Sequence, residues 1–208
     1  MLPRSSLILF ISLLLVLTLG CFRAFPAKSG GAYRGKIVEA ETREPIEGVI
    51  ILGIWFARGM GNGVYYDAHE TVTDKKGDFW ILPPAASLTG IVLDGRLLEP
   101  MSIVIFKAGY EHLGLMPWDS FKEDTILKER IKWEGTKPII PLRKLTPEER
   151  TRKPNDPYID SSIPKEKRKL MDQEIDKEYQ VFLKHRQPQE PVTSPPQPPP
   201  VATPTQSR

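Results

Sequence analysis

The sequence has few of the side chains that most metal and nucleophilic sites need: one cysteine, Cys21, and three histidines among 208 residues. A single cysteine excludes an internal disulfide framework and any metal site built from several cysteines. Zinc hydrolysis uses three protein ligands, usually His and Glu. None of His69, His112 and His185 stands in a His-x-x-Glu or His-Glu-x-x-His spacing. We therefore expect no catalytic residue, no metal, no cofactor and no enzymatic activity.

The N-terminus lacks an apolar run long enough to cross a membrane. The run Leu7–Leu19 is shorter than the about 20 residues that a spanning helix needs. It follows the basic Arg4 and ends at the small Gly20. Its length matches the about 7–15 apolar residues of a secretory signal. Residues 1–20 are therefore predicted to be an export signal.

The end of this run, Leu17–Cys21 (LTLGC), resembles the lipobox of bacterial lipoproteins. The resemblance implies that the Cys21 thiol receives a diacylglyceryl group, that cleavage occurs before Cys21, and that the new α-amine is acylated. Two or more acyl chains hold a protein stably on a lipid bilayer, whereas one chain holds it only reversibly. The alternatives are an uncleaved N-terminal anchor and an ordinary export signal with a bystander cysteine.

The expected location follows from the residue after this cysteine. Phe22 stands where the inner-membrane retention signal of enteric bacteria has Asp. We therefore expect an exported lipoprotein at the periplasmic face of the outer membrane. A net charge of +3 gives no argument for an anionic partner, and export separates the chain from cellular nucleic acid, so no nucleic acid is expected as a partner.

Composition divides the mature chain into four parts. Residues 21–32 contain Pro26, Ser29, Gly30 and Gly31 and are predicted to be a flexible tether. Residues 33–145 consist of short β-like runs broken by turns, and residues 146–186 have helical patterns. Many of the 21 prolines lie in residues 187–208, which have too little apolar surface to fold and are predicted to be a disordered tail.

The β-like part contains about six runs of strand-forming residues. The run Val49–Phe56 is apolar throughout, which is typical of a strand buried on both faces. His69–Thr73 and Asp78–Leu82 are predicted to form a hairpin, in which Gly77 supplies the left-handed residue of the turn and Asp74 caps it through the backbone. The other predicted strands are Tyr33–Ala40, Met101–Lys107 and Lys137–Leu142. Short strands with frequent turns indicate an all-β sandwich.

The strand and turn motifs together resemble the carboxypeptidase regulatory-like domain. The matching segments are Gly35–Val38, Thr42, Pro45–Val49, Thr73–Phe79 with Asp74 and Gly77, and Lys107–Tyr110. The resemblance covers approximately Ala32 to Leu142, about half of the chain. It implies a transthyretin-like, immunoglobulin-like β-sandwich that is an accessory to catalysis and not itself an enzyme.

Three side chains are candidates for surface recognition. Trp118 follows a proline in a predicted loop, and His69 and His112 lie beside predicted loops. We expect the loops Arg58–Ala68 and Leu113–Gly135 to present such residues to an envelope protein or a glycan. Trp55 and Trp80 lie in predicted strands, and we expect them to be core or half-core residues. The alternative function is a small envelope hydrolase, which would need a pocket that holds His69 or His112 beside a carboxylate.

Two helices are predicted between the β-like part and the tail. Thr146 caps the first, with Pro147 at its first helical position. Ser162–Glu166 opens the second, in which four apolar residues recur at helical spacing. A stripe of this kind predicts a helix that docks on the core of its own protein, and the alternative is a helix that binds a partner. The stripe consists of Met171, Ile175, Tyr179 and Phe182.

Overall fold

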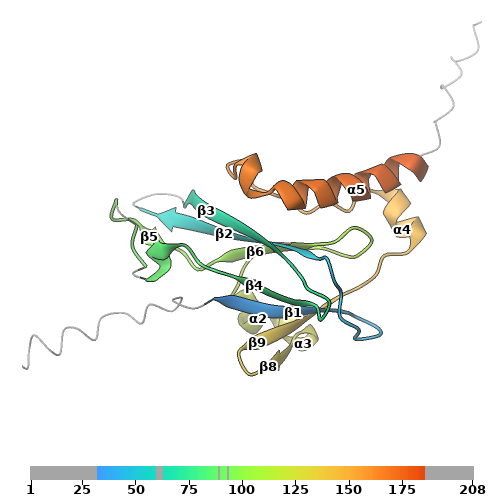
Figure 1. Cartoon of the computed structure of the whole chain (residues 1–208), viewed down its shortest axis with the longest axis horizontal. Coiled ribbons are helices and arrows are strands. Elements are labelled where there is room, and N and C mark those ends of the chain that lie inside the picture. The colour runs from blue at the N-terminus through green and yellow to red at the C-terminus, as the bar shows by residue number, and fades with distance from the viewer. Residues whose placement is uncertain (1–31, 60–62, 89, 93, 186–208) are drawn as a thin grey trace, which may run out of the picture.

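The computed structural model describes residues 32–59, 63–88, 90–92 and 94–185. The predicted export signal, Cys21 and the predicted tail at 187–208 lie outside the described residues. Within them the chain forms two β-sheets and a C-terminal helix (Figure 1). None of the helices in these ranges is long and apolar enough to span a bilayer.

The first sheet, sheet A, has four strands in the order β4-β1-β9-β8. The strand β1 is antiparallel to β4 and parallel to β9, and β8 and β9 form an antiparallel pair. The prolines of β9 predict an edge strand, but β9 lies between β1 and β8. The strands are β1 (Tyr33–Glu39), β4 (Asp78–Ile81), β8 (Lys132–Glu134) and β9 (Lys137–Leu142).

The second sheet, sheet B, is antiparallel throughout. Its main strands follow the order β3-β2-β6-β7, and the short β5 pairs with the end of β2. The strands are β2 (Ile50–Arg58), β3 (Val64–Val72), β5 (Leu97–Leu98), β6 (Ser102–Phe106) and β7 (Leu113–Pro117).

The central strands of sheet B are buried on both faces. Ile51 and Trp55 of β2 point into the core between the two sheets, together with Ile37 and Phe79 of sheet A. The alternate residues of β2 lie in a second apolar cluster on the opposite face, which includes Met171. The apolar run of β2 therefore reflects two different partners, one on each side.

The helix α5 (Lys169–His185) covers the outer face of sheet B (Figure 1). A 3₁₀ turn, η2 (Lys165–Lys167), precedes it, so the predicted second helix begins later than the sequence suggested. Met171 is fully buried against this sheet, which confirms the predicted docking. Tyr179 of the predicted stripe is nevertheless 44% exposed. The side of α5 that faces sheet B includes the buried Glu174 and Glu178, so the helix is turned further than the apolar stripe suggests.

Several polar contacts hold α5 in place. The carboxylate of Glu70 on β3 accepts hydrogen bonds from the first free N–H groups of α5, at Leu170 and Met171, and so caps the helix. The carboxylates of Glu174 and Glu178 accept hydrogen bonds from backbone N–H groups in the β6–β7 loop. Arg150 of α4 (Pro147–Arg152) forms an ion pair with Glu178 at 2.6 Å. The cap of α4 is as predicted, with Thr146 and Glu149 forming a capping box.

The predicted hairpin at residues 69–82 is wrong. The turn is present, with Gly77 at φ +74°, but it joins β3 of sheet B to β4 of sheet A. The strand β4 pairs with β1, and β3 pairs with β2. The local sequence of a turn does not reveal whether the two strands that it joins share a sheet.

Thr73 fixes the corner at which the chain passes between the sheets. Its side-chain hydroxyl accepts a hydrogen bond from the N–H of Val49 at 2.8 Å and donates one to the carbonyl of Ile46 at 2.7 Å. Both contacts are buried, so no water can replace them.

Replacing Thr73 by valine is expected to lower the free energy of unfolding by about 2 kcal/mol, because two buried backbone groups lose their partners. Urea denaturation monitored by circular dichroism measures the change. The matched control is Thr71→Val, a half-exposed position on β3. Equal stability of the two variants would show that the Thr73 hydroxyl does not hold this corner.

The two long predicted loops are largely ordered elements. Within Arg58–Ala68, β3 already begins at Val64, because tyrosines and valine favour strands. Leu113–Gly135 contains β7, two short helices and β8. The helices are α2 (Ser120–Glu123) and α3 (Thr125–Arg130), and Phe121 of α2 is fully buried in the core. This segment therefore belongs to the packed sandwich. A further 3₁₀ turn, η1 (Ala85–Leu88), follows β4.

Candidate binding surface

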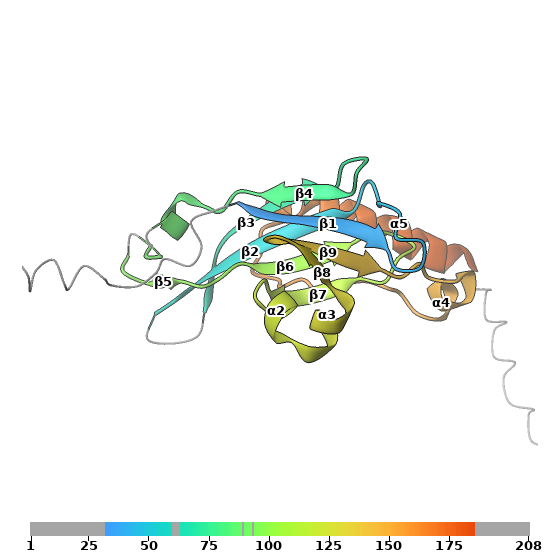
Figure 2. The same ribbon diagram turned by 90° about the horizontal axis from the view of Figure 1, so that it is seen from below.

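The outer face of sheet A is the open face of the sandwich. Figure 2 looks onto this face, and no helix lies in front of β4 and β1. Because side chains alternate along a strand, Phe79 and Ile81 of β4 point into the core, and Asp78 and Trp80 point outward. This face is therefore available to a partner, whereas α5 covers the corresponding face of sheet B.

Trp80 is the most prominent side chain of the open face. It is 58% exposed, whereas Trp55 is buried in the core as expected. The expectation that Trp80 is a core or half-core residue is therefore wrong. Trp80 stands between Phe79 and Ile81, which both point into the core, and this alternation along the strand could have predicted an outward side chain. An exposed indole ring offers a large flat apolar surface for stacking.

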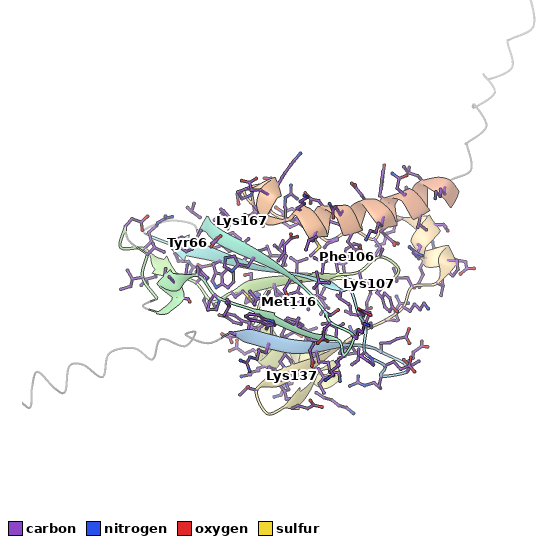
Figure 3. The ribbon with its side chains drawn as sticks, viewed as in Figure 1. Tyr66, Phe106, Lys107, Met116, Lys137 and Lys167 are labelled. Carbon is purple, nitrogen blue, oxygen red and sulfur yellow. The ribbon has the colours of Figure 1, made fainter. Side chains whose placement is uncertain are left out.

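Two cations lie next to this ring. Arg34 is directly opposite Trp80 in the β1–β4 pair, and Lys36 is opposite Asp78. Neither basic side chain has an ion-pair partner within the described ranges. Lys137, in contrast, forms an ion pair with Asp78 at 2.6 Å and lies on the side of sheet A away from α5 (Figure 3). The open face thus joins an aromatic ring to two uncompensated positive charges.

A shallow cavity of about 580 Å³ is hollowed beside this ring. It lies where the edge strand β4 of sheet A meets the edge strand β3 of sheet B. It is lined by Arg34, Gly35, Thr71, Val72, Asp74, Asp78, Phe79, Trp80 and Lys137. We call these residues, with the adjacent Lys36, the Trp80 groove. Its carboxylates and cations can exchange hydrogen bonds with the hydroxyl groups of a ligand.

Asp74 serves the turn at one end of the groove. Its carboxylate accepts hydrogen bonds from the N–H groups of Asp78 at 2.9 Å and Lys76 at 2.8 Å. These bonds hold the pKa of Asp74 below its ordinary value. This is the predicted capping arrangement.

His69 lies outside the Trp80 groove and is engaged at both ring nitrogens. Nδ1 lies 2.8 Å from the carbonyl of Leu82, and Nε2 lies 3.1 Å from the carboxylate of Asp67. Its ring also contacts Trp55 edge-on. A general base needs a free nitrogen within reach of a substrate or nucleophile, and both nitrogens of His69 already have a partner.

The carboxylate beside His69 belongs to the docking of α5. Lys167, just before α5, donates a hydrogen bond to Asp67 at 2.7 Å, and Figure 3 shows it between α5 and sheet B. Burial opposes the charge of Asp67, but the hydrogen bonds from Lys167 and from the N–H of Ala68 outweigh it and lower the pKa of Asp67. The His69–Asp67 pair is therefore a structural contact near the helix.

The other two recognition candidates also take part in packing. Nδ1 of His112 lies 3.0 Å from the side-chain oxygen of Asn155, whose amide donates to the carbonyl of Tyr110. Trp118 is half-buried against the core, and its ring meets Tyr33, Phe79 and Phe121 edge-on. Neither residue lines the Trp80 groove, so the structure does not bring the three sequence candidates together.

Within the described residues no group of three or more His, Cys, Asp or Glu side chains is placed to hold a metal ion. Cys21, the expected lipidation site, and the side chain of His185 lie outside what the structure describes. The Trp80 groove, a cavity with an exposed aromatic ring and charged side chains, is the candidate binding site.

Comparison with known proteins adds no family. No protein-family model matches this chain, and no curated protein sequence matches it. A search of solved structures finds similarity to a 9R-lipoxygenase from Cyanothece PCC8801, at 18% sequence identity and a TM-score of 0.24. The similarity covers 39% of this chain and 11% of the lipoxygenase chain. A likeness this low supports no conclusion about fold or function.

Proposed function

We propose that this chain is a lipid-tethered, non-catalytic binding module of the bacterial cell envelope, which binds a glycan with anionic groups in the Trp80 groove. The lipobox-like segment that ends at Cys21 supports export and tethering. The exposed Trp80 beside the unpaired Arg34 and Lys36 is the observation that carries the binding proposal.

The proposal includes a transthyretin-like type for the sandwich. Four glycines of the motifs that resemble the carboxypeptidase regulatory-like domain stand where the backbone needs them. Gly48, Gly77 and Gly109 have positive φ, and a Cβ atom on Gly35 would lie 2.5 Å from the ring of Phe79. A side chain at these positions would strain the backbone or clash with its neighbours. The glycines of the motifs therefore have a structural role in this sandwich, which supports the proposed type.

The chemistry of the groove favours a glycan. The apolar C–H face of a sugar ring can stack on the exposed indole of Trp80. Arg34 can form paired hydrogen bonds with a carboxylate or phosphate group, and Lys36 adds a second positive charge. Asp78 can accept hydrogen bonds from sugar hydroxyl groups. A neutral glycan would use the ring but leave both cations without a partner.

Replacing Trp80 by alanine is expected to weaken binding of polygalacturonate, an anionic test glycan, by about tenfold, because the ring on which a sugar would stack is removed. Trp80→Phe should retain part of the affinity. Neutral dextran should bind more weakly than polygalacturonate to the wild type, and added salt should reduce the difference. Isothermal titration calorimetry on the purified full chain measures each affinity.

The matched control is Trp118→Phe, which changes a half-buried tryptophan outside the groove and should leave the affinity unchanged. Unfolding curves of all variants show whether a loss of binding reflects a loss of structure. Equal affinity of the wild type and Trp80→Ala, or no binding of the anionic glycan by the wild type, would contradict the proposed ligand.

A further inference from the structure

Exposed apolar side chains gather at one end of the sandwich. Val64, Leu82, Ile91 and Leu97 are each 50% exposed or more, although side chains of this kind usually lie inside a protein. They come from four separate segments: the start of β3, the residue after β4, the loop that follows η1, and β5. We call these four residues the apolar tip.

Backbone pairing places the members of the apolar tip at the same end of the two sheets. Val64 pairs with Ala57 at the end of β2, and Leu97 pairs with the next residue, Arg58. Ile91 forms a β-bridge with Leu97. Leu82 directly follows the pair of Ile81 with Tyr33, the first residue of β1. The four side chains therefore belong to one end of the fold.

The chain enters the fold at this same end. In both Figure 1 and Figure 2, β1 begins toward the end of the molecule where β5 lies, and the C-terminal end of α5 lies at the opposite end. The segment from Cys21 to Tyr33 can span at most about 3.5 Å per residue, or roughly 40 Å in all. A lipid anchor on Cys21 would hold Tyr33, at the same end of the molecule as the apolar tip, within this distance of a bilayer.

Two arginines beside the apolar tip are compensated. Arg58 forms an ion pair with Glu99, and Arg96 forms one with Asp94. Apart from Arg34, which lies opposite Trp80 near Leu82, the tip thus offers apolar area without an unpaired arginine. Such a surface gains from contact with the headgroup and acyl boundary of a bilayer, and its attachment does not need anionic lipids.

We propose that the apolar tip lies in the membrane interface, so that the sandwich stands on the bilayer by this end while the Trp80 groove remains on its side. This inference depends on the proposed lipid anchor at Cys21. Contact by the tip would fix the orientation of the module, which a flexible tether alone would leave free.

The scarcity of cysteine makes this contact measurable in the full-length protein. If Cys21 is lipidated, Leu97→Cys introduces the one free thiol of the chain, which an environment-sensitive fluorophore can label. The protein is extracted from the membranes of an expressing bacterium and reconstituted into vesicles of phosphatidylethanolamine and phosphatidylglycerol. Leu183→Cys, at an exposed position toward the opposite end of the molecule, is the matched control.

The label at residue 97 is expected to shift its emission to shorter wavelength on vesicles and to be quenched by lipids with brominated acyl chains. High salt should leave this signal unchanged. The label at residue 183 should keep the emission that it has in water. Ile91→Cys should behave like Leu97→Cys, which guards against a local effect of one substitution.

Two outcomes would overturn the inference, and they distinguish a failed tip contact from a failed lipid anchor. Identical, water-like emission from residues 97 and 183, with an unlabelled wild type, would show that the protein is anchored but does not touch the bilayer by its apolar tip. Labelling of the wild type at Cys21 would show that the thiol is free, which would remove the anchor and with it the proposed orientation.

Discussion

Replacing Glu178 by alanine is expected to lower the free energy of unfolding by about 3 kcal/mol. The Glu178 side chain is 2% exposed and accepts hydrogen bonds from Arg150 and from the N–H of Gly109. Removing one partner of a buried ion pair costs about 3–5 kcal/mol, because the other charge stays behind without compensation. Arg150 remains 24% exposed, so water can partly solvate it and the expected cost lies at the lower end.

A double-mutant cycle with Arg150→Ala separates the ion pair from the contact with Gly109. Asp176→Ala is the control, because Asp176 lies on an exposed part of the same helix and its loss should change stability little. Equilibrium urea denaturation supplies the free energies. If Glu178→Ala and Asp176→Ala were equally stable, the buried carboxylate would not be what holds α5 on sheet B.

Replacing Cys21 by serine is expected to release the protein from the membrane almost completely. Serine has no thiol to carry a diacylglyceryl group, and each buried methylene of an acyl chain contributes about 0.8 kcal/mol to membrane binding. Losing all acyl chains therefore removes far more attachment energy than any single side-chain contact at the apolar tip supplies. Separation of cell fractions by centrifugation, followed by detection of the protein, measures the change.

Trp80→Ala is the control for this experiment, because it alters the proposed binding groove but leaves the leader and Cys21 intact. It should remain in the membrane fraction as the wild type does. Retention of Cys21→Ser in the membrane fraction at the level of the wild type would show that another segment anchors the chain.

The sequence predicted local structure best where a short pattern of residues has a single physical cause. The unbroken apolar run of β2 predicted burial on both faces, and the core and the α5 cluster provide both. Pro147 after Thr146 predicted the start of α4 at the correct residue. The left-handed residue of the turn at Gly77 was also correct, because few other residues adopt positive φ at low cost.

The errors concern relations between distant residues. The pairing of β4 with β1 depends on Tyr33, far away in the chain, and no feature of the turn at residues 74–77 reveals it. The packing of Trp118 depends on Tyr33 and Phe79, which are distant in the sequence and approach it only in the folded protein. Arg34 was not identified as a candidate for the same reason, because its place beside Trp80 follows from strand pairing.

The mass of the mature N-terminus tests the lipid-tethered function most directly. Protein extracted from membranes is digested, and the peptide that contains residue 21 is examined by mass spectrometry. We predict a peptide that begins at Cys21 and carries a diacylglyceryl group on sulfur and an acyl group on the α-amine. A mature chain that begins at another residue, or a Cys21 without acyl groups, would contradict the proposed tether.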